Sequence, residues 1–300
     1  MTAGNYSKTI LDNGIRIVSE KMEGVRSVSV GVWILIGSRN ESRRNCGISH
    51  LLEHMLFKGT ESRTAFEIAV SLESLGGTLN AFTDREFTCI YAVVLDDNVS
   101  EAVEVMADVI LNPVLDEKDL RVEKQVVLEE IRNLEDSPED RIHEVFVQTV
   151  FNNRSLGSST LGTYESIRRM KKSDLSAYHN KFCAANNIII AAAGCIDHDF
   201  FVDCVSKYFH ALNRGADSVY EQFVLGQDFN RSLRSSISQS HICTGMPSFS
   251  YDSPEKISLI VLNSILGGGM SSRLFQEIRE KKGLAYTIYS FFDFWSDTGL

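Results

Sequence analysis

The sequence predicts an α+β fold in which helices pack on one face of a sheet that is rich in antiparallel strands. Short segments alternate apolar with polar residues, as strands do, and longer segments repeat their apolar residues every three or four positions, as helices do. The two kinds of segment are interleaved in a way that is typical of α+β layers. At 300 residues the chain exceeds what one core usually serves, so we expect two related units.

The chain begins with segments that predict strands. Residues 9–18 form two short β-type runs around Asp12-Asn13-Gly14, and these are residues that accept the positive φ of a hairpin turn. Residues 28–36 then alternate in a way that predicts a strand with one well-buried face. A loop at residues 37–41 leads to an apolar helical segment at residues 47–60.

A second helix is predicted to begin at Thr64, because Thr64-Ala-Phe-Glu67 has the spacing of a capping box. This helix should end at Gly76-Gly77. The residues expected to face inward are Phe66, Ile68, Ala69, Leu72 and Leu75. Residues 78–83 and 87–95 follow as an expected antiparallel pair, joined by Asp84-Arg85-Glu86.

The rest of the first unit is predicted to be mainly helical. Helices are expected at residues 98–112, 117–136, 139–152, 173–182 and 198–211, with a buried strand at 186–194. A polar stretch at 213–232 is the candidate linker, so the first domain is placed at 1–212.

Residues 233–300 are expected to begin a second copy of this layout. A strand at 237–245 and helices at 253–266 and 271–282 follow the order of the first unit with an offset of roughly 208 residues. Residues 288–295 are expected to be a further apolar element, and the chain is expected to stop at residue 300 within a strand. We expect this second domain to lack a metal motif of its own and to be incomplete at residue 300.

Composition limits the classes of partner. The net charge of −10, from 30 basic and 40 acidic residues, argues against nucleic acid, which is bound by clustered basic side chains. Six cysteines without a Cys-x-x-Cys pair favour a reducing compartment. No targeting segment is visible, and no apolar run approaches the length of a membrane span. These features predict a cytoplasmic protein, or an organellar chain without its leader, and no membrane partner.

The segment from residue 47 to 60 carries the most informative pattern, His50-Leu-Leu-Glu53-His54. In a helix, residues three and four apart share a face, so His50, Glu53 and His54 should point the same way. Two imidazoles one turn apart can hold a zinc ion, and the carboxylate beside them could accept a proton from an attacking water. A chance pattern on an ordinary core helix is the alternative.

The order of this pattern, together with an acidic helix downstream, resembles the M16 family of inverzincin peptidases. The resemblance is strongest to the branch of mitochondrial-processing-peptidase-like and bacterial processing proteases. That family has its third zinc ligand 76 residues after the second histidine, which implies Glu130, and a further carboxylate seven residues earlier, which implies Glu123. Without the resemblance, Glu123, Glu129 and Glu130 would be interpreted as a solvated helix face.

Two further segments match the family. The segment ending in Asn80-Ala81-Phe82-Thr83 resembles the exposed edge strand that binds substrate, although Asn80 alone could equally be a turn or strand-end residue. Arg279 and Tyr286, which follow a glycine-rich loop, resemble the pair that contacts the bound peptide from the second half. The alternative for that pair is a solvated arginine and a tyrosine in a strand core.

The resemblance implies a zinc-dependent metalloendopeptidase that cleaves extended or unfolded peptides. It assigns Zn²⁺ binding to His50, His54 and Glu130, the general base to Glu53, and an orienting role to Glu123. It also implies that the complete protein forms a homodimer. A catalytically silent structural or partner subunit of the same family is the alternative, although such chains are expected to lose ligands or the base.

Overall fold

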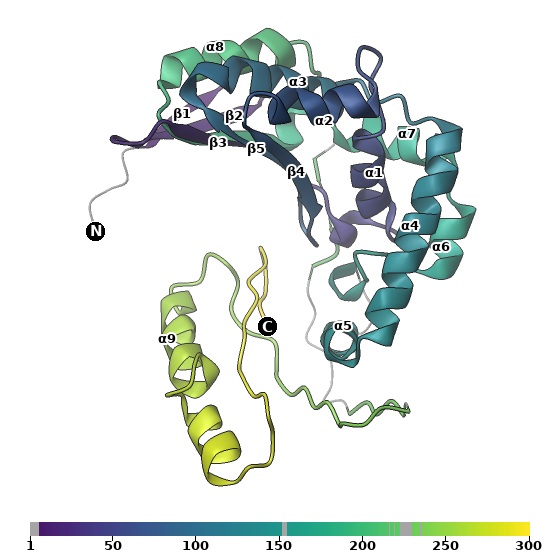
Figure 1. Ribbon diagram of the computed structural model, residues 1–300, viewed down its shortest axis with the longest axis vertical. Helices are drawn as coiled ribbons and strands as arrows, with labels where there is room; N and C mark the ends of the chain where they lie inside the picture. The colour runs from purple at the N-terminus through teal and green to yellow at the C-terminus, as the bar shows by residue number, and fades with distance from the viewer. Residues whose placement is uncertain (1–5, 152–154, 216, 219, 223–229, 235) are drawn as a thin grey trace. The chain divides into compact units, whose positions relative to one another are not determined.

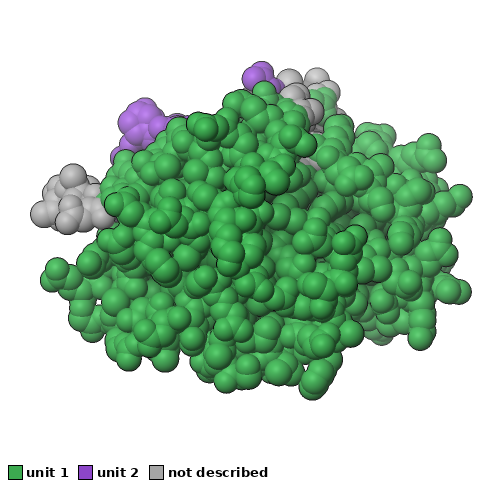
Figure 2. Space-filling view, turned by 90° about the horizontal axis from the view of Figure 1, so that it is seen from above, with its two compact units in different colours: residues 1–144, 153–221 green, residues 145–152, 222–300 purple. Residues whose placement is uncertain are grey.

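The computed structural model describes residues 6–151, 155–215, 217–218, 220–222, 230–234 and 236–300 (Figure 1). The chain divides into two compact units, which Figure 2 colours separately: residues 1–144 with 153–221, and residues 145–152 with 222–300. Part of the expected linker at 213–232 lies outside the described residues, namely 216, 219 and 223–229. The domain boundaries expected from the sequence stay a prediction.

The first unit is built on one six-stranded sheet with the order β1-β2-β6-β3-β5-β4 (Figure 1). Neighbouring strands are antiparallel except for β2 and β6, which are parallel. The mixed, mainly antiparallel sheet confirms the predicted α+β class. The strands are β1 (Tyr6–Ile10), β2 (Arg16–Lys21), β3 (Ser27–Ile34), β4 (Thr78–Thr83), β5 (Thr88–Leu95) and β6 (Ile188–Gly194).

The turn between β1 and β2 confirms the predicted hairpin. Gly14 has a φ of +98°, which a residue with a Cβ atom rarely adopts. The side-chain amide of Asn13 donates hydrogen bonds to the backbone oxygens of Phe209 (2.9 Å) and Leu212 (3.1 Å). The turn therefore also anchors the hairpin to the end of the last helix of this unit.

The core of the first unit lies between the sheet and its helices. Val28, Val30 and Val32 on β3 are at most 2% exposed, and they alternate with Ser27 and Ser29, which are exposed. Helix α3 contacts β3 and β5, and α8 contacts β2, so the helices cover the face to which these valines point. This alternation is the pattern from which the strand was predicted.

Eight α-helices of this chain precede residue 210 in the described residues. They are α1 (Ile48–Leu56), α2 (Ala65–Glu73), α3 (Val99–Leu111), α4 (Glu117–Asp136), α5 (Pro138–Val150), α6 (Tyr164–Arg169), α7 (Lys172–Phe182) and α8 (His198–Phe209). The bounds of α4 agree with the predicted 117–136. Helix α6 was not predicted, because its six residues are too few to show an apolar period.

Helix α2 confirms the capping box but corrects the expected inward face. Thr64 accepts a hydrogen bond from the Glu67 backbone, and the Glu67 carboxylate accepts one from the Thr64 backbone. Ile68 and Leu72, one turn apart, are buried, whereas Phe66 is 75% exposed and Ala69 is also exposed. Phe66 precedes Ile68 by two positions, which places the two side chains on opposite faces of the helix.

The second unit differs from the prediction. Helix α9 (Lys256–Gly267) is present, but residues 275–281 form a π-helix where an α-helix was expected. No strand is found at 237–245 or 288–295 among the described residues, which show only isolated bridges such as Phe294 to Gly299. A strand needs a partner for its backbone groups, and these segments have no neighbouring strand in the described part of the unit.

None of the described helices has the combination of length and apolar character needed to cross a membrane.

Candidate metal centre

Helix α1 carries both histidines, and its first turn is fixed by close backbone packing and by hydrogen bonds to Glu41. Gly47, which precedes it, has a φ of +86°, and a Cβ there would come within 2.6 Å of the Leu161 backbone oxygen. The carboxylate of Glu41 accepts hydrogen bonds from the backbone N–H groups of Gly47 (2.6 Å) and Ser49 (2.8 Å). Burial raises the pKa of Glu41 to about 8. These contacts fix the first turn of the helix, which begins at Ile48, two residues before His50.

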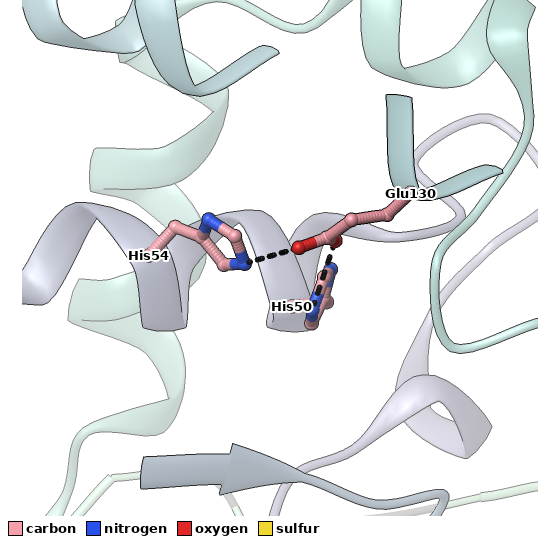
Figure 3. Close-up of side chains that lie close together, drawn as sticks. All are labelled: His50, His54 and Glu130. Carbon is pink, nitrogen blue, oxygen red and sulfur yellow. Dashed lines mark ion pairs between the residues drawn. The ribbon is translucent and has the colours of Figure 1, made fainter. Parts of the chain in front are cut away.

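His50 and His54 lie one turn apart on α1, and Glu130 reaches them from α4, which packs against α1 (Figure 3). The Nε2 atom of His50 is 3.6 Å from Oε2 of Glu130, and the Nε2 atom of His54 is 3.7 Å from Oε1. One ligand atom from each residue lies within 4.8 Å of the others. The structure thus brings together the three residues predicted as metal ligands.

The chemistry of this cluster fits a zinc ion. Donor atoms around a tetrahedral zinc are about 3.4 Å apart, close to the separations seen here. The Oε2 atom of Glu130, which faces Nε2 of His50, is buried without a hydrogen-bond partner among the described residues. Burial, with a smaller effect from His54, lowers the pKa of His50 to about 4. The imidazole of His50 is therefore neutral over a wide pH range, as a metal ligand must be.

Glu123 occupies a different place from the three ligands. It is 5% exposed, and its carboxylate lies between Nδ1 of His54 (3.0 Å) and the Nζ atom of Lys58 (2.7 Å). Burial alone would raise the pKa of Glu123, but the hydrogen bonds from Lys58 and His54 outweigh it and lower that pKa. Because an ionised carboxylate only accepts, Nδ1 of His54 donates, which leaves its Nε2 lone pair directed at the cluster.

Glu53 lies on α1 with the two histidines, and its carboxylate is held by β4. The hydroxyl of Thr83 donates a hydrogen bond of 2.5 Å to Oε2 of Glu53. Burial raises the pKa of Glu53, and the Thr83 hydrogen bond and His54 oppose that rise. A raised pKa suits a group that must accept and then release a proton near neutral pH.

The sequence did not single out Glu41, Lys58 or Thr83. Thr83 lies within the strand segment that resembles the family, and Lys58 follows His54 by four residues, so spacing offered a signal for both. The contact from Glu41 to the start of α1 depends on a loop conformation that no local pattern reveals.

Strand β4 forms one edge of the sheet, as predicted. Asn80 and Phe82 are exposed on one face of the strand, whereas Ala81 packs partly against the core. Phe82 is 44% exposed and makes edge-to-face contacts with the rings of Phe87 and Tyr91. No second strand pairs with β4 among the described residues, so its outer edge presents free backbone groups.

Arg279 and Tyr286 lie in the second unit and are close to each other. The guanidinium of Arg279 is 5.1 Å from the centroid of the Tyr286 ring and 4.6 Å from that of Phe275. Tyr286 is 82% exposed, so it is not the strand-core residue that was considered as the alternative. The contact of this pair with a bound peptide stays a prediction.

The whole chain resembles known peptidases. The family described as insulinase (peptidase family M16) matches residues 16–164, and the family described as peptidase M16 inactive domain matches residues 169–300. An uncharacterized zinc protease of Bacillus subtilis (strain 168), YmxG, is 41% identical over 288 residues, covering 96% of this chain and 70% of the relative. The chain belongs to peptidase family M16. The three candidate metal ligands and Glu53 lie in the first matched segment of this chain, and Arg279 and Tyr286 lie in the second.

Solved structures share the fold of this M16 chain. A protease from Helicobacter pylori has a TM-score of 0.85 at 23% identity, covering 98% of this chain and 73% of that one. A chain of complex III2 from Candida albicans has a TM-score of 0.80 at 23% identity, covering 98% of this chain and 69% of that one. Because a protease and a complex III2 chain both match, the fold alone does not distinguish a peptidase from a subunit of an assembly.

Proposed function

We propose that this M16 chain is a zinc-dependent metalloendopeptidase that hydrolyses extended or unfolded peptides. The observation that carries the proposal is that one ligand atom each from His50, His54 and Glu130 lies within 4.8 Å of the others. The carboxylate of Glu53 lies on α1, the helix that carries the two histidines. A catalytic zinc site uses three protein ligands and keeps a fourth position open. The two histidines and the glutamate supply that number.

His50, His54 and Glu130 would hold the zinc ion, which would supply a Lewis acid for the scissile carbonyl. Glu53 removes one proton from the attacking water as the water oxygen bonds to the carbonyl carbon. The same carboxyl then gives this proton to the amide nitrogen as the carbon–nitrogen bond breaks. Glu123 acts through His54, since its hydrogen bond of 3.0 Å fixes the orientation of that imidazole.

The free edge of β4 supports the choice of substrate. An extended peptide can add to the sheet as another strand, and backbone hydrogen bonds then hold it largely without regard to its sequence. In this proposal Asn80, Ala81 and Phe82 form the part of β4 that binds the peptide. The exposed ring of Phe82 offers an apolar contact for one peptide side chain.

Arg279 and Tyr286 complete the proposed site from the second unit. Both carry donors that can stabilise the oxyanion that develops during hydrolysis. Their role requires the two units to close around the peptide, within one chain or across the homodimer that we propose for the complete protein.

The same proposal includes two further assignments. It places the protein in the branch of mitochondrial-processing-peptidase-like and bacterial processing proteases, and it places the protein in the cytoplasm.

The rival function is a catalytically silent subunit of the same family. Such a subunit has no need for a proton acceptor beside the metal ligands, so it would be expected to lose Glu53 or one of the ligands. This chain has Glu53, His50, His54 and Glu130. The intact set therefore favours the peptidase.

The test compares neighbouring glutamates in purified protein. Glu130→Gln should leave far less than one zinc per chain, whereas Glu129→Gln should keep it, because Glu129 is exposed and pairs with Arg132. Glu53→Gln should retain zinc while its turnover of a mixed peptide library falls on the order of a hundredfold or more. Zinc is measured by atomic emission and turnover by cleavage-site mapping with and without a chelator. Near-normal turnover in zinc-replete Glu53→Gln would refute the proposal.

A further inference from the structure

The contact between Thr83 and Glu53 joins the two parts of the proposed site. Thr83 is the last residue of β4, and α1 packs against this strand. Its hydroxyl lies 2.5 Å from Oε2 of Glu53, the short separation that is typical of a hydroxyl donating to a charged carboxylate. The Oε1 atom of Glu53 makes no hydrogen bond in the described part of the chain.

The neighbouring hydroxyls direct the Thr83 proton toward Glu53. Thr88, on the adjacent strand, lies 3.4 Å from the Thr83 oxygen and donates to the backbone oxygen of Ile36 at 2.9 Å. A threonine hydroxyl has one proton, so Thr88 has none left for Thr83. Thr83 is therefore free to donate its own proton to the carboxylate of Glu53.

The surroundings of Glu53 offer few other ways to hold its carboxylate. A small cavity of about 30 Å³ borders it, with apolar walls that include Ile34, Leu52 and Leu56. Among the polar groups at this cavity, Ser49 and Tyr178 are hydrogen-bonded to each other at 2.8 Å. The Thr83 hydroxyl is therefore the side chain that holds the Glu53 carboxylate among the described residues.

We propose that Thr83 is a positioning residue for the peptidase reaction. Its hydroxyl holds Oε2 of Glu53 and so presents Oε1 as the atom that accepts the proton of the attacking water. This inference rests on the proposed role of Glu53 as general base. It assigns a function to a side chain that is neither one of the three proposed metal ligands nor one of the residues proposed to bind the peptide.

The position of Thr83 adds a second consequence. Side chains alternate along a strand, so Thr83 points to the same side as Ala81, toward α1, while Asn80 and Phe82 point to the other side. In this proposal one short strand offers its free edge to the peptide and also orients Glu53, the base that takes a proton from the attacking water. Small misplacements of reacting groups cost large factors in rate, so fixing both partners on one strand favours catalysis.

The test uses two variants at position 83 in the complete protein. Thr83→Val keeps the shape but removes the hydroxyl, and we expect kcat to fall about tenfold to a hundredfold with KM unchanged, the effect of losing one hydrogen bond to a charged group. Thr83→Ser retains the hydroxyl and should stay within about threefold of the wild type by the same reasoning. Zinc content should match the wild type in both variants, and the thermal midpoint of each should lie well above the assay temperature, which shows that both remain folded.

A double-mutant comparison separates this inference from the proposed function. Once Glu53→Gln has removed the base, adding Thr83→Val should lower the residual turnover no further. Equal losses in Thr83→Val and Thr83→Ser, a raised KM, or loss of zinc in Thr83→Val would overturn the positioning role. If Glu53→Gln itself keeps normal turnover, the proposed function fails; if Glu53→Gln is inactive and Thr83→Val is normal, only the role of Thr83 fails.

Discussion

Helices α3 and α9 are similar in length and in apolar content, but their surroundings differ. Nine residues of α3 (Val99–Leu111) are buried, whereas in α9 (Lys256–Gly267) only Gly267 is. Helix α3 packs on the sheet and against α2 and α8. An apolar helical sequence thus predicts that a helix will form and that it needs to be buried. It does not specify the surface that buries the helix, because that surface comes from other parts of the fold.

The exposed face of α9 is large. Its exposed residues include Ile257 (64%), Val261 (53%), Leu262 (55%) and Ile265 (50%). Helices with apolar residues on most sides are normally interior helices. The described residues of the second unit therefore leave uncovered a surface of the kind that the first unit encloses.

The largest effect should come from removing matched side chains from these two helices. Ile110 on α3 is fully buried, whereas Ile265 on α9 is half exposed. We expect Ile110→Ala to lower the free energy of unfolding of the first unit by about 2–5 kcal/mol, since it leaves a cavity in a packed core. Ile265→Ala should cost about 0.5 kcal/mol or less.

Urea denaturation followed by circular dichroism would measure both changes. A loss for Ile265→Ala as large as that for Ile110→Ala would contradict the contrast between the two helices. It would mean that α9 is enclosed in solution by a surface that the described residues do not include. Sedimentation of the same samples would then show whether a second copy of the chain provides that surface.

The two units also differ in where they place titratable groups. In the first unit the side chain of His50 is 15% exposed where α1 packs against α4, whereas those of Glu277 and Lys281 in the second unit are more than half exposed. Burial and His54 lower the pKa of His50 from 6.5 to about 4. We therefore expect the stability of the zinc-free first unit to depend on pH between these values.

The direction of this dependence follows from proton binding. Between pH 6.5 and pH 4 the unfolded chain protonates His50 while the folded protein does not, so the stabilising contribution is present above pH 6.5 and is lost as the pH falls toward 4. The lowered pKa of His50 corresponds to a change of about 3 kcal/mol in the free energy of unfolding across this pH range. Urea midpoints in the presence of a chelator should fall over this range in the wild type and fall less in His50→Leu. Parallel curves for the two proteins would show that His50 is not the group responsible.

Much of the first unit could be predicted because its signals are local. The turn at Asn13-Gly14, the capping box at Thr64 and the alternation along β3 depend on neighbouring residues, and all three are found. The histidines of α1 share a face because they are one turn apart. The distance to Glu130 was supplied by the family resemblance, since no local pattern specifies which glutamate of α4 faces α1.

The failures have physical causes that lie outside the local sequence. The segment at 237–245 has apolar character, but no strand pairs with it among the described residues, so its alternation did not predict its structure. Phe66 is apolar but lies on the opposite side of α2 from Ile68, which is buried. Thr83 could not be assigned as a partner of Glu53 because their contact joins a strand end to a helix 30 residues away.

The smallest expected effect concerns how the helices of the two units begin. Thr64 caps α2 through a reciprocal pair of hydrogen bonds with Glu67, whereas Glu255, at the corresponding position of α9, makes no side-chain capping bond. We expect Thr64→Ala to lower the free energy of unfolding by about 1 kcal/mol, because it leaves a backbone N–H of the first turn without its acceptor. Thr64→Ser keeps the acceptor and should lose only a few tenths of that value.

Glu255→Ala is the control, and it should change the free energy of unfolding by less than about 0.5 kcal/mol, because Glu255 is exposed and has no capping role. Urea midpoints of the three variants test this, and an equal loss in Thr64→Ala and Glu255→Ala would show that the capping box does not distinguish the two units.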